Sequence, residues 1–85
     1  MPEISRFYGI IILMYWQEHN PPHFHAEYQG NKMTVDISTL ETKGEFPHRA
    51  KALIFEWISL HRSELLKNWE LSLAGKPMEK IIPLD

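Results

Sequence analysis

The chain contains no cysteine among its 85 residues. This absence excludes a disulfide framework, a thiolate nucleophile and the zinc and iron–sulfur sites that cysteine ligates. Because nothing in the sequence requires an oxidising compartment, we expect a cytoplasmic protein. We expect no organic cofactor. The sequence leaves open whether histidine and carboxylate side chains hold a divalent metal ion.

The sequence also lacks an excess of charge of either sign. Nine Lys and Arg residues against eleven Asp and Glu residues give a formal net charge of -2. This net charge does not support nucleic acid as a partner, because such binding usually depends on an excess of positive charge. The one long apolar run, residues 7–16, is shorter than the about 20 residues that a membrane-spanning helix needs, so we expect no membrane association.

What the chain does have is enough apolar side chains for one core. Hydrophobic residues make up 44% of the sequence and aromatic residues 12%, which is typical of a globular protein. The length excludes a second domain, because a single domain usually takes about 100–150 residues. We therefore expect one small domain over residues 1–85.

The first half of the chain predicts β-strands. Residues 5–16 contain three consecutive isoleucines flanked by aromatic residues, a composition typical of a strand. Asn20, Pro21 and Pro22 then interrupt regular structure. Residues 23–29 and 32–38 alternate between apolar and polar side chains, which predicts two half-buried strands joined by a tight turn at Gly30 and Asn31.

This turn fixes the register of the hairpin. With Gly30 and Asn31 as the loop residues, His25 lies opposite Asp36 in the neighbouring strand. One face of the hairpin is then apolar and consists of Phe24, Ala26, Tyr28, Met33, Val35 and Ile37. The other face is polar and consists of His23, His25, Glu27, Thr34, Asp36 and Ser38. A shift by one residue would mix the two faces, so the pattern favours this register.

The second half of the chain predicts helix. Pro47 suits a first helical position, and apolar residues recur at helical spacing from Ala50 to His61. The pattern fits either one helix over residues 47–74 or two helices with Ser63 as the second N-cap, and Gly75 ends the helix in both cases. We therefore predict an α+β fold, a three-stranded antiparallel β-meander packed on one face by one long or two consecutive α-helices.

The histidines of the polar face are the candidates for chemistry. His23 and His25 point to the same side of a strand, with Asp36 about 5 Å from His25 between Cβ atoms. The pair could bind a divalent metal together with Glu27 or Asp36. It could instead work as a general acid and base, with His23, His25 and Asp36 as catalytic residues in metal-independent RNA cleavage. A third option is that the histidines stiffen the turn and form a recognition surface.

The strand over residues 5–16 offers a candidate partner surface. Both of its faces are apolar, and helices on one side of the sheet would leave the other face exposed. Met14 and Trp16 belong to such a face. We therefore include them among the candidate binding residues, and a second copy of the chain is one candidate partner.

The sequence resembles the bacterial family DUF4160, a domain of unknown function. The block Asn20-Pro21-Pro22-His23-Phe24-His25 is specific to this family, and further matches lie at residues 4–10, 14–15, 56–57, 60–62, 64–66, 68–70 and 75–77. The chain departs from the family pattern at residues 11–13, where relatives often hold a charged residue. No activity is established for the family, so the resemblance carries over no catalytic roles.

What the resemblance implies is a binding function. Members are commonly encoded beside a second small protein, which suggests one half of a two-gene, toxin-antitoxin-like module whose partner is the neighbouring gene's product. The positions that match the family and that we expect to bind are Arg6, Tyr8, His19 and Asn20, beside Met14 and Trp16. Whether the protein is an enzyme stays open. The alternative function is a small ribonuclease or metal-dependent hydrolase that uses His23, His25 and Asp36.

Overall fold

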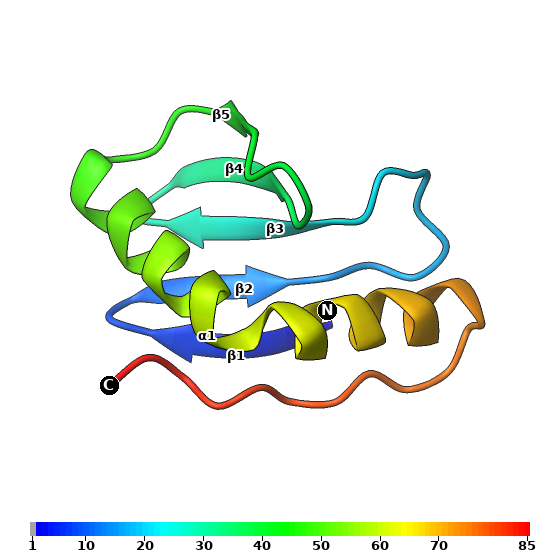
Figure 1. The fold of residues 1–85 in the computed structure, drawn as a ribbon. Helices are drawn as coiled ribbons and strands as arrows, with labels where there is room; N and C mark the ends of the chain where they lie inside the picture. Colours follow the sequence, from blue (N-terminus) through cyan, green and yellow to red (C-terminus); the bar gives the residue numbers. More distant parts are fainter. Residues whose placement is uncertain (1) are drawn as a thin grey trace.

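A computed structural model describes residues 2–85 and shows a five-stranded sheet with one helix. The elements in chain order are β1 (Glu3–Phe7), β2 (Ile10–Leu13), β3 (His23–Tyr28), β4 (Asn31–Asp36), β5 (Thr42–Gly44) and α1 (His48–Leu73). All neighbouring strands are antiparallel, in the order β1-β2-β3-β4-β5. The helix crosses one face of the sheet (Figure 1). The α+β class and the antiparallel meander are confirmed, but the sheet has five strands and not three.

The predicted strand over residues 5–16 is in fact a hairpin of two strands, β1 and β2, and residues 14–16 lie after the end of β2. Tyr8 and Gly9, with φ of 51° and 81°, form its two-residue loop, and Phe7 pairs with Ile10. Positive φ at both loop positions is typical of a type I′ turn, where glycine suits the second position. The apolar run hid this turn because residues on both strands are buried in the same core, so Gly9 was the only signal.

The hairpin of β3 and β4 forms at the predicted place but in a different register. Gln29 and Gly30 are the loop residues, with φ of 48° and 82°, so glycine again takes the second position of the turn. His23 therefore pairs with Asp36, and His25 pairs with Thr34. The predicted pairing of His25 with Asp36 is wrong by two residues. A shift of two residues keeps each side chain on its face, so the two predicted faces remain.

The fifth strand was not predicted. Residues 39–45 are mostly polar, but within them β5 pairs with β4, and Lys43 lies opposite Thr34. Three residues are too few to show an alternating pattern. β5 is thus a short edge strand that widens the polar face of the sheet.

The helical half of the chain is one helix of 26 residues with a kink. Pro47 precedes its first turn, and Gly75, with φ of 70°, follows its end. The kink lies at His61, whose φ of -131° and ψ of 21° are not helical. The structure therefore shows one long helix in two segments that meet at His61, two residues before Ser63, the predicted second N-cap. Within residues 2–85, no helix is apolar over a stretch long enough to cross a membrane.

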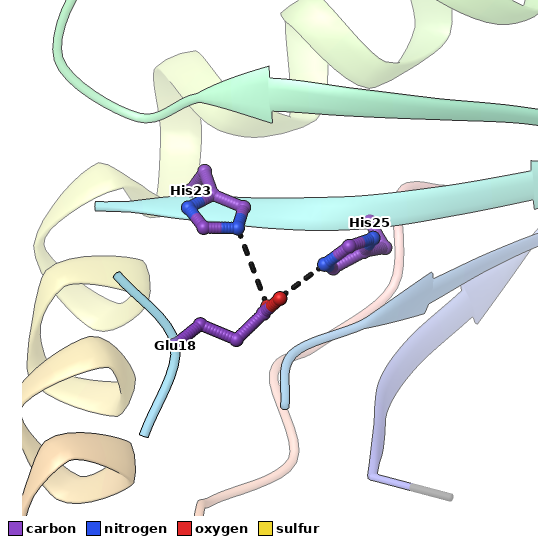
Figure 2. Close-up of side chains that lie close together, drawn as sticks. All are labelled: Glu18, His23 and His25. Atoms are coloured by element: carbon purple, nitrogen blue, oxygen red, sulfur yellow. Dashed lines mark hydrogen bonds and ion pairs between the residues drawn. The ribbon is translucent and has the colours of Figure 1, made fainter. Parts of the chain in front are cut away.

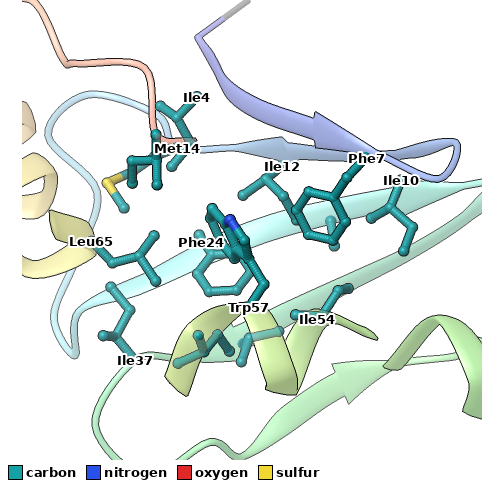
Figure 3. Packing of buried hydrophobic residues seen from close by; sticks show 14 of the residues in the cluster. Ile4, Phe7, Ile10, Ile12, Met14, Phe24, Ile37, Ile54, Trp57 and Leu65 are labelled. Carbon is teal, nitrogen blue, oxygen red and sulfur yellow. The ribbon is translucent and has the colours of Figure 1, made fainter. Parts of the chain in front are cut away.

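The core lies between the sheet and α1 and is centred on Trp57 (Figure 3). The ring of this fully buried residue lies 5.2 Å from that of Phe7 and 6.0 Å from that of Phe24 between centroids. Its Nε1–H donates to the carbonyl of Ile82 at 2.9 Å. The C-terminal segment also pairs with β1, since the Ile81 amide donates to the carbonyl of Ile4 at 2.8 Å. Helix and C-terminal segment thus cover one face and one edge of the sheet.

Candidate functional site

The connection between β2 and β3 brings a carboxylate to the histidines. Residues 14–22 form this connection, and Glu18 lies near its middle. The connection is tied to the end of α1, because the Gln17 amide donates to the carbonyl of Ser72 at 3.2 Å. Trp16 Nε1–H also donates to the carbonyl of Lys76 at 2.8 Å. These contacts hold Glu18 beside the first residues of β3.

Three side chains converge at this point: Glu18, His23 and His25. Glu18 Oε1 lies 2.8 Å from His25 Nε2 and 3.3 Å from His23 Nε2 (Figure 2). One ligand atom from each residue lies within 4.8 Å of the other two. The side chains are 30%, 19% and 27% exposed, respectively. The cluster is therefore partly shielded from water and still open to a small ligand.

The hydrogen bonds of His23 fix the role of its two ring nitrogens. Its Nδ1 lies 2.8 Å from the carbonyl oxygen of Pro21, which can only accept a hydrogen bond, so Nδ1 carries a proton. Nε2 then either presents a lone pair or carries a second proton toward Glu18. A ring whose far nitrogen donates to a backbone carbonyl is the usual arrangement of a metal-ligating histidine.

Aromatic contacts hold both imidazoles in place. Trp69 of α1 packs against His23, with 5.2 Å between ring centroids. The ring of Tyr15 meets that of His25 edge-on at 4.7 Å, and the two imidazoles lie 5.4 Å apart. A site with such support loses little side-chain entropy when it binds a ligand.

Asp36 and Glu27, the carboxylates expected from the sequence, are not part of this cluster. Asp36 Oδ1 instead accepts hydrogen bonds from the amides of Ser38 at 2.8 Å and Thr39 at 2.9 Å. These bonds, above all the one from Thr39, lower the pKa of Asp36. Its role is to stabilise the turn after β4. Glu27 pairs with Ile11 and Lys32 in the sheet, further along β3 from His23.

Glu18 is the residue that the sequence did not indicate. The strand pattern indicates only carboxylates that face the histidines across the sheet, whereas Glu18 reaches the histidines from a loop. The end of β2 at Leu13 would have indicated Glu18. Leu13 pairs with His25, so the residues that follow Leu13 must pass the start of β3. A charged residue in such a connection lies close to the strand it enters.

The expected binding residues do not gather on one surface. Met14 is fully buried in the core, so the contact with a partner that the sequence predicted for it does not fit the fold. Tyr8 is 58% exposed but lies in the turn between β1 and β2, at the opposite end of β2 from His19 and Asn20. Arg6 pairs with Glu3 at 2.7 Å, and this hydrogen bond lowers the pKa of Glu3.

Two adjoining hollows lie beside the histidines on the face opposite the helix. The larger, of about 450 Å³, is lined by His19, Asn20, Pro21, His23, Thr34, Asp36, Glu41 and Lys43. The smaller, of about 280 Å³, is lined by Tyr15, His25, Ala26, Glu27, Lys32, Met33, Thr34 and Lys43. Thr34 and Lys43 border both hollows. Each hollow therefore has one histidine of the cluster in its wall, His23 in the larger and His25 in the smaller, and shares two polar side chains with the other.

Comparison with protein families supports the resemblance seen in the sequence. The model of the family described as Domain of unknown function (DUF4160) matches residues 9–70. The chain belongs to this family. The matched part of this DUF4160 protein includes Glu18, His23 and His25. Neither the curated proteins nor the solved structures contain a match to the chain.

Proposed function

We propose that this DUF4160 protein binds one divalent metal ion through Glu18, His23 and His25 and uses the ion to hydrolyse a substrate. The observation that carries the proposal is the convergence of two imidazole nitrogens and one carboxylate oxygen within 4.8 Å. Two histidines and one carboxylate are the protein ligands of many hydrolytic zinc sites, in which water takes the fourth position.

The distances within the cluster suit such an ion. Ligand atoms on a tetrahedral zinc lie about 3.3 Å apart, because each lies about 2.0–2.1 Å from the metal. Glu18 Oε1 and His23 Nε2 are already 3.3 Å apart. Glu18 Oε1 and His25 Nε2 are closer, at 2.8 Å, since a hydrogen bond joins them. An ion seated between the three atoms would replace this hydrogen bond and lengthen the contact between Glu18 and His25.

The surroundings of the cluster favour hydrolysis over a purely structural metal. A structural zinc is enclosed by four protein ligands, whereas this cluster supplies three and opens toward hollows large enough for a small substrate. A bound metal would make its water a stronger nucleophile at neutral pH. The water oxygen would add to the substrate, and its two protons would end on the two products, so no further reactant is needed.

Metal binding is tested by calorimetric titration of tag-free protein with Zn²⁺ and Mn²⁺. We expect one equivalent of metal to bind. His25→Ala should lower the metal affinity by at least about 100-fold, because loss of a ligand should cost more than loss of a residue that only hydrogen-bonds to a ligand. Glu18→Gln, which keeps the shape of the side chain, should also weaken binding. His48→Ala, at an exposed position in the first turn of α1, is the matched control and should bind as wild type does. A folded wild-type protein without saturable binding would overturn the proposal.

The hydrolytic role is tested separately with RNA and small activated esters. Cleavage that requires the metal, stops in a chelator and is lost in His25→Ala would support it. Cleavage that is lost in His25→Ala but continues in a chelator would replace the metal with acid–base catalysis by His23 and His25. Protein that binds metal but cleaves none of these substrates would overturn the hydrolytic role and leave the metal site standing.

A second candidate function is binding of a small protein partner, for which the family resemblance suggests the product of a neighbouring gene. It is favoured by the half-exposed side chains on the uncovered sheet face, where Ile11 lies opposite Glu27 and Tyr15 borders a hollow. A partner on this face would also cover the metal site. We expect Ile11→Glu to abolish complex formation in a co-purification assay, while Leu60→Glu on the exposed side of α1 does not. Equal binding by both variants would place the partner elsewhere.

A further inference from the structure

We propose that the metal centre acts on phosphate esters, with Thr34 and Lys43 holding the phosphate oxygens that the metal does not hold. This inference rests on the proposed function, because it assigns a substrate class to the same site. It starts from the alignment of side chains across the sheet and from the distribution of charge around the two hollows.

The register aligns three polar side chains in one row on the open face. His25 pairs with Thr34 across β3 and β4, and Thr34 pairs with Lys43 across β4 and β5. Paired residues in neighbouring strands point to the same face, and strands lie about 4.8 Å apart. A metal-ligating imidazole, a hydroxyl and an ammonium group therefore come from three neighbouring strands, about 4.8 Å apart at the backbone from one strand to the next.

These two residues also border both hollows, so a ligand in either one meets them. Thr34 offers a hydroxyl donor, and Lys43 offers three N–H donors and a positive charge. Among residues 2–85, Lys43 forms no ion pair, whereas Lys67 is paired with Glu79. Lys32, in the next row, lies directly opposite Glu27. Lys32 borders only the smaller hollow, whereas Lys43 borders both, so Lys43 is the lysine of this face that meets an anion in either hollow.

The acidic side chains of the larger hollow leave room for such an anion. The Asp36 carboxylate points its Oδ1 into the turn after β4, where two amides already bind it. The charged side chains of this face are four carboxylates and two lysines, namely Glu18, Glu27, Asp36, Glu41, Lys32 and Lys43. Without metal the face is thus negative, and a divalent ion would neutralise it. We expect an anion to bind only after the metal.

A phosphate ester fits this arrangement better than a neutral substrate. One of its free oxygens can bind the metal while another accepts hydrogen bonds from Thr34 and Lys43. In the reaction, the water oxygen bonds to phosphorus and the bond from phosphorus to the alcohol oxygen breaks. One proton of water ends on the phosphate and the other on the alcohol. Thr34 and Lys43 would thus bind and orient the group that reacts.

The test is titration of the Mn²⁺-loaded protein with inorganic phosphate, followed by hydrolysis assays. We expect phosphate to bind the loaded protein but not the metal-free protein. Lys43→Gln should weaken phosphate binding at least about tenfold, and Thr34→Val about fivefold, without changing metal affinity. Lys32→Gln should have a smaller effect than Lys43→Gln. Lys80→Gln, in the C-terminal segment, is the matched control and should have none.

The outcomes separate this inference from the proposed function. Protein that binds Mn²⁺ but not phosphate would overturn the inference and leave the metal site intact. Protein that binds no metal would overturn both. Equal phosphate affinity in wild type, Lys43→Gln and Thr34→Val would overturn the role of the two residues. Diester and monoester cleavage are then distinguished with bis(p-nitrophenyl) phosphate and p-nitrophenyl phosphate. Failure to cleave both compounds would limit the site to phosphate binding and overturn the substrate assignment.

Discussion

The two faces of the sheet are built from the same strands but carry different side chains. In β3 and β4, four residues that face α1 are fully or almost fully buried, namely Phe24, Ala26, Met33 and Val35. The residues between them are half exposed and include both histidines. The alternation of a β-strand thus separates stability from function, because every second position forms the core and the positions between form the site. Changes on one face should therefore have little effect on the other.

The largest effect should come from the centre of the covered face. Trp57→Ala removes the side chain that touches Phe7 and Phe24 and the hydrogen bond to the carbonyl of Ile82. We expect a loss of about 3–5 kcal/mol in the free energy of unfolding. A small domain is stable by about 5–15 kcal/mol, so much of the margin would be lost. Urea unfolding measures the loss, and Leu60→Ala on the exposed side of α1 is the control. Equal losses of unfolding free energy in the two variants would contradict the central place of Trp57 in the core.

Two adjacent residues of β3 provide the sharpest comparison of the faces. Phe24→Ala should cost about 3–5 kcal/mol, because the ring is fully buried. His25→Ala in metal-free protein should cost only about 1 kcal/mol, since it removes one hydrogen bond to Glu18 and one edge contact with Tyr15. Thermal and urea unfolding of both variants without metal check the difference. Equal losses would show that the open face also supports the fold.

The smallest expected effect concerns pH. The amide of Thr39 and, to a smaller extent, that of Ser38 lower the pKa of Asp36 in the folded chain below its ordinary value of 3.8. The stabilisation this carboxylate gives is therefore present above pH 3.8 and is lost as the pH falls through the lowered pKa. We expect Asp36→Asn to cost less than about 1 kcal/mol at pH 7. Its difference from wild type should shrink as the pH falls below 3.8. A difference that stays constant over this range would exclude the carboxylate as its source.

The comparison of faces also explains how far the sequence could predict the fold. The alternation at residues 23–38 predicts β3, β4 and the composition of each face, and the helical spacing from Ala50 predicts α1. The split of residues 5–16 at Tyr8 and Gly9 was hidden because both strands are buried. The register was wrong because Gly30 takes the second loop position and not the first. Both errors concern turns, where a single glycine carries the information.

The candidate site could be predicted only in part. His23 and His25 follow from their spacing on one strand, which depends on local geometry alone. Glu18 does not, because its position depends on the path of the connection over residues 14–22. That path is set by contacts with the end of α1, such as the hydrogen bond from Trp16 to Lys76, which are distant in sequence. Long-range packing thus decides which carboxylate joins the histidines.

The central claim is that Glu18, His23 and His25 together ligate one metal ion. X-ray absorption spectroscopy of the tag-free protein loaded with one equivalent of Zn²⁺ tests it most directly. The account predicts scattering from two imidazole rings, with nitrogen and oxygen ligands at about 2.0–2.1 Å, and from one ring only in His25→Ala. A spectrum of bound zinc without imidazole scattering, or one that is the same in wild type and His25→Ala, would contradict it.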